Sequence, residues 1–227
     1  MFAFGTWQDL PSGAEDPVAG GCRRICLIVR LTSVMARVAI LVEGESDRGA
    51  VLALTASQGI DLLRSGVIVV AMGGITNIAR YVTELGPPGE QLRLTGLYDA
   101  GEERFVRRGL EVGGYPPGPG REGLAALGFH RCDRDLEDEL IRALGINRVL
   151  AVLEAQRDLA PFRTLQQQPA HRGRPIADQL HRFFGAGSGR KVRYGRLLVE
   201  ALDRSQMPPP LAAVLADALA DPDQCSR

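Results

Sequence analysis

The sequence predicts an α/β fold in which a parallel sheet of about four strands is flanked by helices and followed by an all-helical C-terminal extension. Runs of apolar, mostly β-branched residues at 38–42 and 67–72 are typical of strands that are buried on both faces of a parallel sheet. Each run is followed by a segment with helical spacing, and this order repeats through residue 110. Because such alternation is typical of parallel strands joined by right-handed crossovers, it decides the fold class.

The individual elements follow from the same patterns. The first strand, 38–42, ends at Glu43 and Gly44, and Ser46 is expected to cap a helix that continues to Ile60. Further strands are expected at 67–72, 92–98 and 128–132, and further helices at 77–85, 102–110, 146–156, 175–184, 191–202 and 210–219. Asp133 or Asp135 is expected to cap one more helix, whose first turn is acidic. Gly and Pro dominate residues 113–120, which are expected to form a loop.

The sequence also predicts how the chain divides. The predicted parts are a disordered arm or over-long gene start at 1–34, an α/β domain at 35–145, a helical extension carrying Lys191 at 146–220, and a frayed tail at 221–227. The first part lacks a hydrophobic period, and Met35 stands directly before the first strand. An edge strand at 25–31 is the alternative for this part.

Composition narrows the function classes. The 227 residues carry a formal net charge of zero, so any DNA-binding surface must be a local patch. The four cysteines contain no C-x-x-C pair, which argues against a zinc framework or a disulfide scaffold. Arg30 and Arg37 interrupt the apolar stretch 25–42, and no secretory signal is visible. We therefore expect a cytoplasmic protein without a membrane partner.

Acidic residues follow the predicted strands. Glu43 and Asp47 come after the first strand, and Asp99 ends the third. Further acids after the third and fourth strands are Glu102, Glu103, Asp135, Glu137 and Asp138. Parallel topology brings the carboxyl ends of strands to one edge, where crowded carboxylates repel one another unless cations neutralise them. Mg²⁺ or Mn²⁺ is the expected cation, and two such ions about 4 Å apart can hold the oxygens of a phosphodiester displacement.

Four of these acids also have a simpler interpretation. Glu43 could be a solvated strand end, and Asp47 could only complement the helix dipole. Asp135 could be a plain N-cap, and Glu137 a solvated acid in the first helical turn. The residues alone leave these alternatives open.

The basic residues are 26 arginines and a single lysine, Lys191. A compact ammonium fits a tight site that a guanidinium does not, so this lysine is a candidate catalytic residue, the alternative being a chance surface position. Arg190 and Arg193 beside it suit phosphate contact, or else an exposed helix face. Residues 185–192 are not a P-loop, because the lysine lacks a preceding Gly and a following Ser or Thr.

Five stretches carry a resemblance to a known family. They are Leu-Val-Glu-Gly-Glu-Ser-Asp at 41–47, Gly-Leu-Tyr-Asp at 96–99, Asp-Leu-Glu-Asp-Glu-Leu at 135–140, Phe-Arg-Thr-Leu-Gln-Gln-Gln-Pro at 162–169, and Gly-Arg-Lys-Val at 189–192. Together they resemble the Toprim domain, the metal-binding α/β module of topoisomerases, bacterial primases and the overcoming-lysogenization-defect (OLD) nucleases. The sequence is most similar to the OLD type, in its stand-alone bacterial form without an ATPase domain.

The resemblance implies a set of site residues. It implies metal binding by Glu43 and Asp47, by the Asp-x-Asp motif that starts at Asp99, and by an acidic motif at Glu137. It implies that Lys191 stabilises charge on the transferred phosphoryl group.

One motif departs from the family pattern. The second aspartate position of Asp-x-Asp is Gly101 in this chain. Either Glu102 or Glu103 substitutes with a longer side chain, or one ligand is lost.

The resulting hypothesis is a Mg²⁺- or Mn²⁺-dependent nuclease that cleaves or nicks DNA. The residues assigned to it are Glu43 and Lys191 for catalysis, Glu43, Asp47, Asp99, Glu102 and Glu137 for metal, and Arg190 and Arg193 for nucleic acid. The alternative is a non-catalytic module that binds metal and nucleic acid and acts with a separate ATPase. Hydrolysis of RNA or nucleotides is a second enzymatic alternative, and a homodimer is compatible with the sequence.

Overall fold

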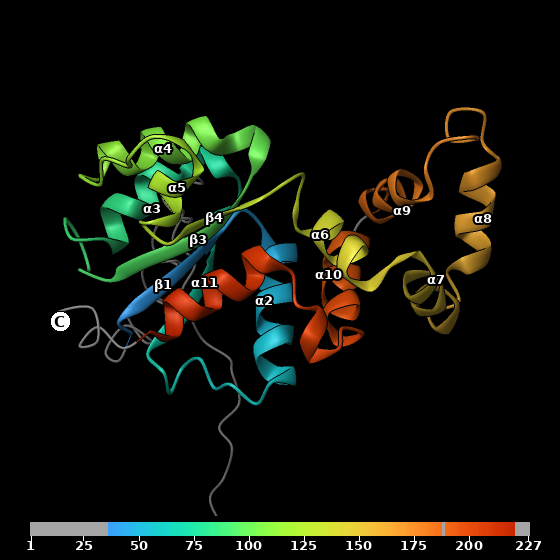
Figure 1. The fold of residues 1–227 in the computed structure, drawn as a ribbon, viewed down its shortest axis with the longest axis horizontal. Coiled ribbons are helices and arrows are strands. Elements are labelled where there is room, and N and C mark those ends of the chain that lie inside the picture. The colour runs from blue at the N-terminus through green and yellow to red at the C-terminus, as the bar shows by residue number, and fades with distance from the viewer. Residues whose placement is uncertain (1–35, 188, 221–227) are drawn as a thin grey trace, which may run out of the picture. The chain divides into compact units, whose positions relative to one another are not determined.

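The computed structural model describes residues 36–187 and 189–220. Their sheet has four parallel strands, β1 (Val38–Val42), β2 (Val67–Ala71), β3 (Arg93–Asp99) and β4 (Phe129–Cys132), in the order β2-β1-β3-β4 (Figure 1). The parallel α/β fold class is therefore confirmed. The expected arm or edge strand before residue 35 and the expected tail at 221–227 lie outside the described residues.

Helices cover both faces of the sheet. Their bounds are α2 (Glu45–Ser57), α3 (Ile78–Leu85), α4 (Glu103–Val112), α5 (Gly120–Ala125), α6 (Leu136–Leu144), α7 (Ile146–Ala155), α8 (Leu159–Gln167), α9 (Ile176–Gly185), α10 (Arg190–Glu200) and α11 (Pro209–Leu219). Helices α3 and α4 lie on one face, and α2 and α11 lie on the other (Figure 1). In the described residues, no helix has the length and apolar character needed to cross a membrane.

The central strand β1 shows why the sheet needs both layers. All five of its residues are buried. Val38, Ile40 and Val42 join the hydrophobic core that also contains residues of α2 and α11. Successive side chains of a strand point to opposite faces, so Ala39 and Leu41 face α3 and α4. Burial on both faces explains the uninterrupted apolar run in the sequence.

The register fixes where the strands end. Val42 lies opposite Ala71 of β2, and Asp99 lies opposite Cys132 of β4. Gly96 of β3 permits this close pairing, because a Cβ there would lie 2.6 Å from the Leu41 carbonyl oxygen. The carboxyl ends of β1, β3 and β4 therefore meet at one edge of the sheet, as the topology predicts.

Two local expectations are corrected. Helix α2 begins at Glu45 with Gly44 as its N-cap, and it ends at Ser57 rather than at Ile60. Ser46 is therefore inside the helix and does not cap it. Of the two candidate caps for α6, Asp135 is the one that accepts the Asp138 N–H, at 2.9 Å. The short helix α5 was not expected from the Gly- and Pro-rich sequence around it.

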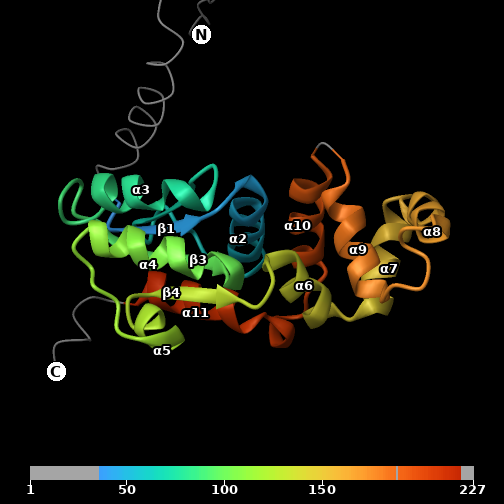
Figure 2. The ribbon, with the colours of Figure 1, turned by 90° about the horizontal axis from the view of Figure 1, so that it is seen from above.

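The C-terminal helices return to the α/β part of the fold. Helix α10 lies between α2 and α9 in both views (Figure 2), and α11 packs against β1, β3 and β4. The last helix of the expected C-terminal extension is thus part of the sheet's covering layer. The division of the chain at residue 145 stays a prediction.

A glycine brings α10 close to α2. A Cβ at Gly195 would lie 3.1 Å from the Oγ of Ser46 and 3.2 Å from its carbonyl oxygen. Lys191 is one helical turn before Gly195 and so shares its face of α10. Its carbonyl oxygen accepts a hydrogen bond from Ser46 Oγ at 3.3 Å. Close helix packing therefore positions the single lysine of the chain next to the first turn of α2.

Replacing Gly195 with valine is expected to lower the free energy of unfolding by about 1–3 kcal/mol, because the added carbons overpack this contact. Urea unfolding measures the change. The control is Gly49→Ala in α2, where a Cβ meets no heavy atom within 4 Å. Alanine in a helix interior is expected to stabilise by about 0.5–1 kcal/mol. A Gly195→Val variant as stable as the wild type would contradict the close packing.

Candidate metal centre

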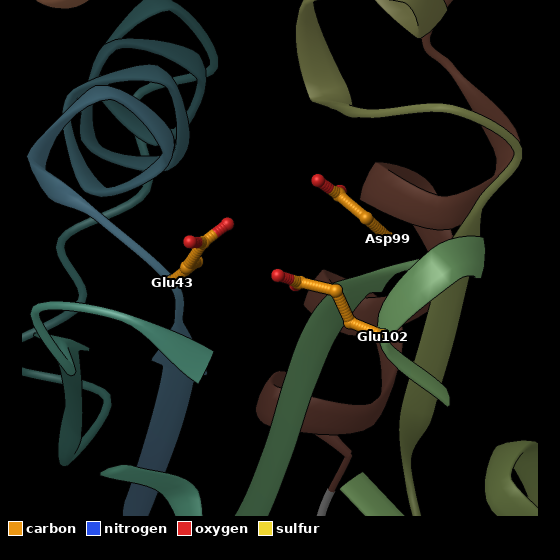
Figure 3. Close-up of side chains that lie close together, drawn as sticks. All are labelled: Glu43, Asp99 and Glu102. Atoms are coloured by element: carbon orange, nitrogen blue, oxygen red, sulfur yellow. The ribbon is translucent and has the colours of Figure 1, made fainter. Parts of the chain in front are cut away.

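Three carboxylates converge at the carboxyl edge of the sheet. Glu43 follows β1, Asp99 ends β3, and Glu102 lies in the 3-10 turn Ala100–Glu102. One oxygen of each side chain lies within 4.8 Å of an oxygen of the other two. Figure 3 shows the three side chains pointing into the same space from the end of β1, the end of β3 and the turn that follows β3. We call Glu43, Asp99 and Glu102 the carboxylate cluster.

The backbone at this edge holds the cluster in place. The carbonyl oxygen of Glu43 accepts the Gly74 N–H at 3.1 Å, which ties the end of β1 to the residues after β2. The 3-10 turn after Asp99 brings Glu102 back toward the end of β1. Glu103 instead begins α4 and pairs with Arg107 at 2.9 Å, as residues four apart on a helix do. Glu102 is therefore the acid that joins the cluster.

Gly101, which stands at the second aspartate position of the Asp-x-Asp motif, has room for a side chain. Gly101 is exposed, and a Cβ at this position would meet no heavy atom within 4 Å. Steric crowding therefore does not explain the missing aspartate.

A second group of charged residues lies beside the cluster. Glu137 of α6 is only 2% exposed and accepts the Ser46 hydroxyl hydrogen at 2.7 Å. The Nζ of Lys191 lies 3.4 Å from its other oxygen. Asp47 accepts the Gly44 N–H at 3.0 Å, so its carboxylate turns back toward the start of α2. This group joins α2, α6 and α10.

Burial and like charge disturb the titration of these acids. Burial raises the pKa of Asp99 to about 8, and the nearby carboxylates of Asp135, Asp47, Glu102 and Glu43 add to the effect. Burial also raises the pKa of Asp47 to about 6, with Glu137 as the next cause. Asp47, in the second group, therefore raises the pKa of Asp99 in the carboxylate cluster, and Glu43 of the cluster raises the pKa of Asp47.

The pKa values of Glu102 and Lys191 are also raised by nearby carboxylates. The pKa of Glu102 is raised by burial and by Glu43. Burial by itself would lower the pKa of Lys191, but Glu137, Asp47 and Asp135 outweigh it, so the net shift is upward. Lys191 is therefore a cation at neutral pH.

A histidine holds the neighbouring Asp135. Arg134 donates to Nδ1 of His181 at 3.2 Å, so Nε2 carries the proton and donates to Asp135. Burial would raise the pKa of Asp135, but the hydrogen bonds from His181 and the Asp138 N–H lower it overall. The result is a fixed anion near Asp99.

Three observations indicate that the carboxylate cluster can hold a hard divalent cation. Within residues 36–187 and 189–220, no arginine or lysine forms an ion pair with Glu43, Asp47, Asp99 or Glu102. One carboxylate oxygen of Glu102 is buried without a hydrogen-bond partner. Raised carboxyl pKa values are the expected response of crowded acids that lack a cation. Carboxylate oxygens are the ligands that Mg²⁺ and Mn²⁺ prefer.

The two arginines assigned to nucleic acid contact other parts of this chain. Arg190 donates to the carbonyl of Ala186 at 2.8 Å, and its guanidinium lies 4.2 Å from the centroid of the Phe183 ring. Arg193 pairs with Asp158 at 3.4 Å and donates to Gln156 at 2.8 Å. Their role in nucleic-acid binding stays a prediction.

Two residues of this region have roles that the sequence does not indicate. The sequence predicts Ser46 as a helix cap, whereas its hydroxyl binds Glu137, 91 residues later in the chain. His181 received no role, although it binds Asp135, which is 46 residues earlier. Neither pairing leaves a signal in local spacing. The only available hint was the position of Ser46 directly beside Asp47.

Metal binding is expected to release protons near neutral pH. Asp99 has a pKa of about 8 and Asp47 about 6, whereas a bound metal requires ionised carboxylates. Metal affinity is therefore expected to rise as the pH increases from about 6 to about 8. Calorimetric titration of Mn²⁺ in buffers of different ionisation enthalpy measures the released protons. An affinity that is constant across this range would contradict the raised pKa values.

The metal-free protein is expected to become less stable as the pH rises from the ordinary aspartate pKa of 3.8 to about 8. Asp99 keeps its proton in the folded state up to about pH 8, whereas the unfolded chain releases it near the ordinary value of 3.8. The folded state therefore binds more protons between these values, so rising pH favours unfolding. Mn²⁺ is expected to cancel this loss.

The geometry and the fold together define an α/β domain with acids at the carboxyl edge of a parallel sheet. Residues 34–86 match the family described as "Overcoming lysogenization defect protein-like, TOPRIM domain". No curated protein sequence matches the chain significantly. This stretch of the chain, residues 34–86, is similar to a Toprim domain of the OLD type.

Solved structures show the same fold. The C-terminal region of the Xanthomonas campestris pv. campestris OLD protein is 24% identical, with a TM-score of 0.66, and the match covers 86% of this chain and 100% of that one. The C-terminal region of the Burkholderia pseudomallei OLD protein is also 24% identical, with a TM-score of 0.59, and covers 82% of this chain and 99% of that one. The similarity extends beyond the sheet into the C-terminal helices.

Proposed function

We propose that the chain is a divalent-metal-dependent phosphodiesterase that cleaves or nicks DNA. The convergence of Glu43, Asp99 and Glu102 within 4.8 Å of one another is the observation that carries the proposal. An OLD-type Toprim domain points to metal-dependent chemistry on nucleic acid, and the cluster supplies suitable ligands. When bound, Mg²⁺ or Mn²⁺ would stabilise negative charge on the phosphate and favour ionisation of water.

Different residues of the chain would bind the metal, neutralise charge and orient the ligands. The carboxylate cluster would hold a metal ion, and Asp47 and Glu137 would supply further oxygens beside it. Lys191 carries a positive charge at neutral pH and reaches Glu137 at 3.4 Å, so its ammonium is placed to neutralise charge that develops on a phosphate. Ser46 orients Glu137 through its 2.7 Å hydrogen bond.

Cleavage of supercoiled plasmid in Mg²⁺ or Mn²⁺, with a chelator as the negative control, tests the proposal. We expect nicked or linear product that depends on the metal. The absence of product with both metals, across a panel of plasmid, linear and single-stranded DNA, would contradict it. RNA and nucleotides in the same panel test the second enzymatic alternative.

A binding module that acts with a separate ATPase is the second candidate. Gly101 favours it, because the Asp-x-Asp position that this residue occupies offers no carboxylate. Calorimetric titration separates the two candidates. Metal binding together with metal-dependent turnover supports the phosphodiesterase, whereas metal binding without turnover on any substrate supports the binding module.

A further inference from the structure

Helix α9 holds the short segment that leads from β4 into α6. Arg134 of this segment donates to Asp178 of α9 at 2.7 Å and to Nδ1 of His181 at 3.2 Å. Nε2 of His181 donates to Asp135, the N-cap residue of α6. These partners are 44 to 47 residues apart in the chain, so the contacts depend on how α9 packs against α6.

The surroundings of His181 fix its tautomer. A guanidinium can only donate hydrogen bonds, so Nδ1 accepts from Arg134, and the single N–H of the neutral ring is on Nε2. That N–H is directed at Asp135, and the side chains of His181 and Asp135 are only 26% and 13% exposed. The ring therefore has one hydrogen bond to donate, and Asp135 accepts it.

Asp135 transmits this contact to the first turn of α6. One of its oxygens accepts from His181, and the other accepts the Asp138 N–H at 2.9 Å. The carboxylate is thus held by α9 on one side and by the backbone of α6 on the other. Glu137 lies in the same helical turn. The hydrogen bond from His181 therefore helps to determine where Glu137 is placed.

The position of Glu137 has little freedom. Its Oε1 accepts the Ser46 hydroxyl hydrogen at 2.7 Å, and its Oε2 is buried without a hydrogen-bond partner in residues 36–187 and 189–220. The Nζ of Lys191 lies 3.4 Å from Oε2. A buried carboxylate oxygen without a donor is costly unless a cation compensates it. Such an oxygen can contact a cation only if the start of α6 is correctly placed.

We propose that His181 is a positioning residue of the metal centre, which fixes the first turn of α6 through Asp135 and so aims Glu137 at the bound cation. This inference rests on the proposed function and assigns the C-terminal helices a part in it. Residues that orient metal ligands through hydrogen bonds contribute about 10–100-fold to metal affinity or activity. His181 acts through another residue, so it is not itself catalytic.

The test compares two substitutions of His181. His181→Leu removes the donor, whereas His181→Gln keeps an N–H donor at about the distance of Nε2 from the backbone. Calorimetric titration measures Mn²⁺ affinity, and plasmid cleavage over a range of Mn²⁺ concentrations gives the half-maximal concentration. His181→Leu is expected to worsen both by about 10–100-fold. His181→Gln is expected to retain most of the wild-type values, and an equal loss in both variants would overturn the inference.

His130→Leu is a matched control for loss of stability. Nε2 of His130 in β4 lies 2.6 Å from Asp217 of α11, and this histidine is 15% exposed. The control therefore removes a second histidine–aspartate contact, in which no residue assigned to the site takes part. It is expected to lower the thermal unfolding temperature while the folded protein keeps its Mn²⁺ affinity. His181→Leu that behaves in the same way has a structural role only, which would overturn the inference.

The dependence on Asp135 can be tested separately. Asp135→Ser keeps a residue that can cap α6 but removes the carboxylate that His181 holds. If His181 acts through Asp135, then His181→Leu is expected to cause little further loss of Mn²⁺ affinity in the Asp135→Ser background. Losses that simply add would show that His181 acts independently of Asp135 and would overturn the inference.

Two outcomes distinguish this inference from the proposed function. Wild-type protein that cleaves plasmid, together with His181→Leu whose Mn²⁺ affinity matches that of His130→Leu, overturns the inference and leaves the function standing. Wild-type protein that binds Mn²⁺ but cleaves no substrate, together with weakened Mn²⁺ binding in His181→Leu and recovery in His181→Gln, supports the inference and contradicts the function. Thermal unfolding measures the folded fraction of each variant at the temperature of the titrations.

Discussion

Replacing Glu43 with glutamine is expected to reduce metal-dependent plasmid cleavage by about 10²–10³-fold, the usual cost of removing one group that stabilises the transition state. Glutamine keeps the shape of the side chain and removes its charge. The cluster then offers two carboxylates instead of three, so affinity for Mn²⁺ is expected to fall as well. Initial rates of plasmid conversion and calorimetric Mn²⁺ titration measure the two effects.

The same variant is not expected to destabilise the metal-free protein. Glu43 contributes to the raised pKa of Asp99, Asp47 and Glu102, so its neutralisation relieves repulsion. The control is Glu45→Gln, two residues away, where an exposed side chain pairs with Arg48 at 3.2 Å. Cleavage at the wild-type rate by Glu43→Gln would contradict the assignment of Glu43 to the site.

Replacing Lys191 with methionine is expected to reduce cleavage by about 10²–10³-fold, because its ammonium is the cation placed to neutralise developing charge. Methionine keeps the length of the side chain without the charge. Lys191 does not belong to the carboxylate cluster, so Mn²⁺ affinity is expected to change less than in Glu43→Gln. A rate loss with near-normal metal affinity distinguishes a role in the chemistry from a role in metal binding.

A second substitution controls for the ion pair with Glu137. Lys191→Met leaves a 2% exposed carboxylate with the Ser46 hydroxyl as its hydrogen-bond partner, so some loss of stability is expected. Lys191→Arg keeps the positive charge and is expected to retain more stability, while its larger planar group still lowers the cleavage rate. Full activity in the methionine variant would refute the catalytic role.

The sequence predicted the parts of the fold that depend on local pattern. Uninterrupted apolar runs identified β1 and β2, because strands buried on both faces carry no polar alternation. The strand–helix order then placed Glu43 and Asp99 at one edge, since parallel strands share their direction. Both steps need only spacing and a topological rule.

The remaining features depend on contacts between distant segments. The choice of Glu102 over Glu103 follows from a 3-10 turn and from the Arg107 ion pair, and neither has a strong local signature. The contact of Ser46 with Glu137 depends on the packing of α10 against α2 and of α6 against α10. Gly195 permits the close approach of α10 to α2. In the sequence alone, a glycine inside a helix indicates only a position that lowers the stability of the helix. The return of α11 to the sheet is likewise a tertiary effect.

A crystal soaked in Mn²⁺ would show whether Glu43, Asp99 and Glu102 hold a metal ion, because anomalous scattering locates the ion independently of the protein coordinates. We expect a Mn²⁺ peak in contact with carboxylate oxygens of these three residues. Strong Mn²⁺ peaks elsewhere, with none between these three side chains, would contradict it.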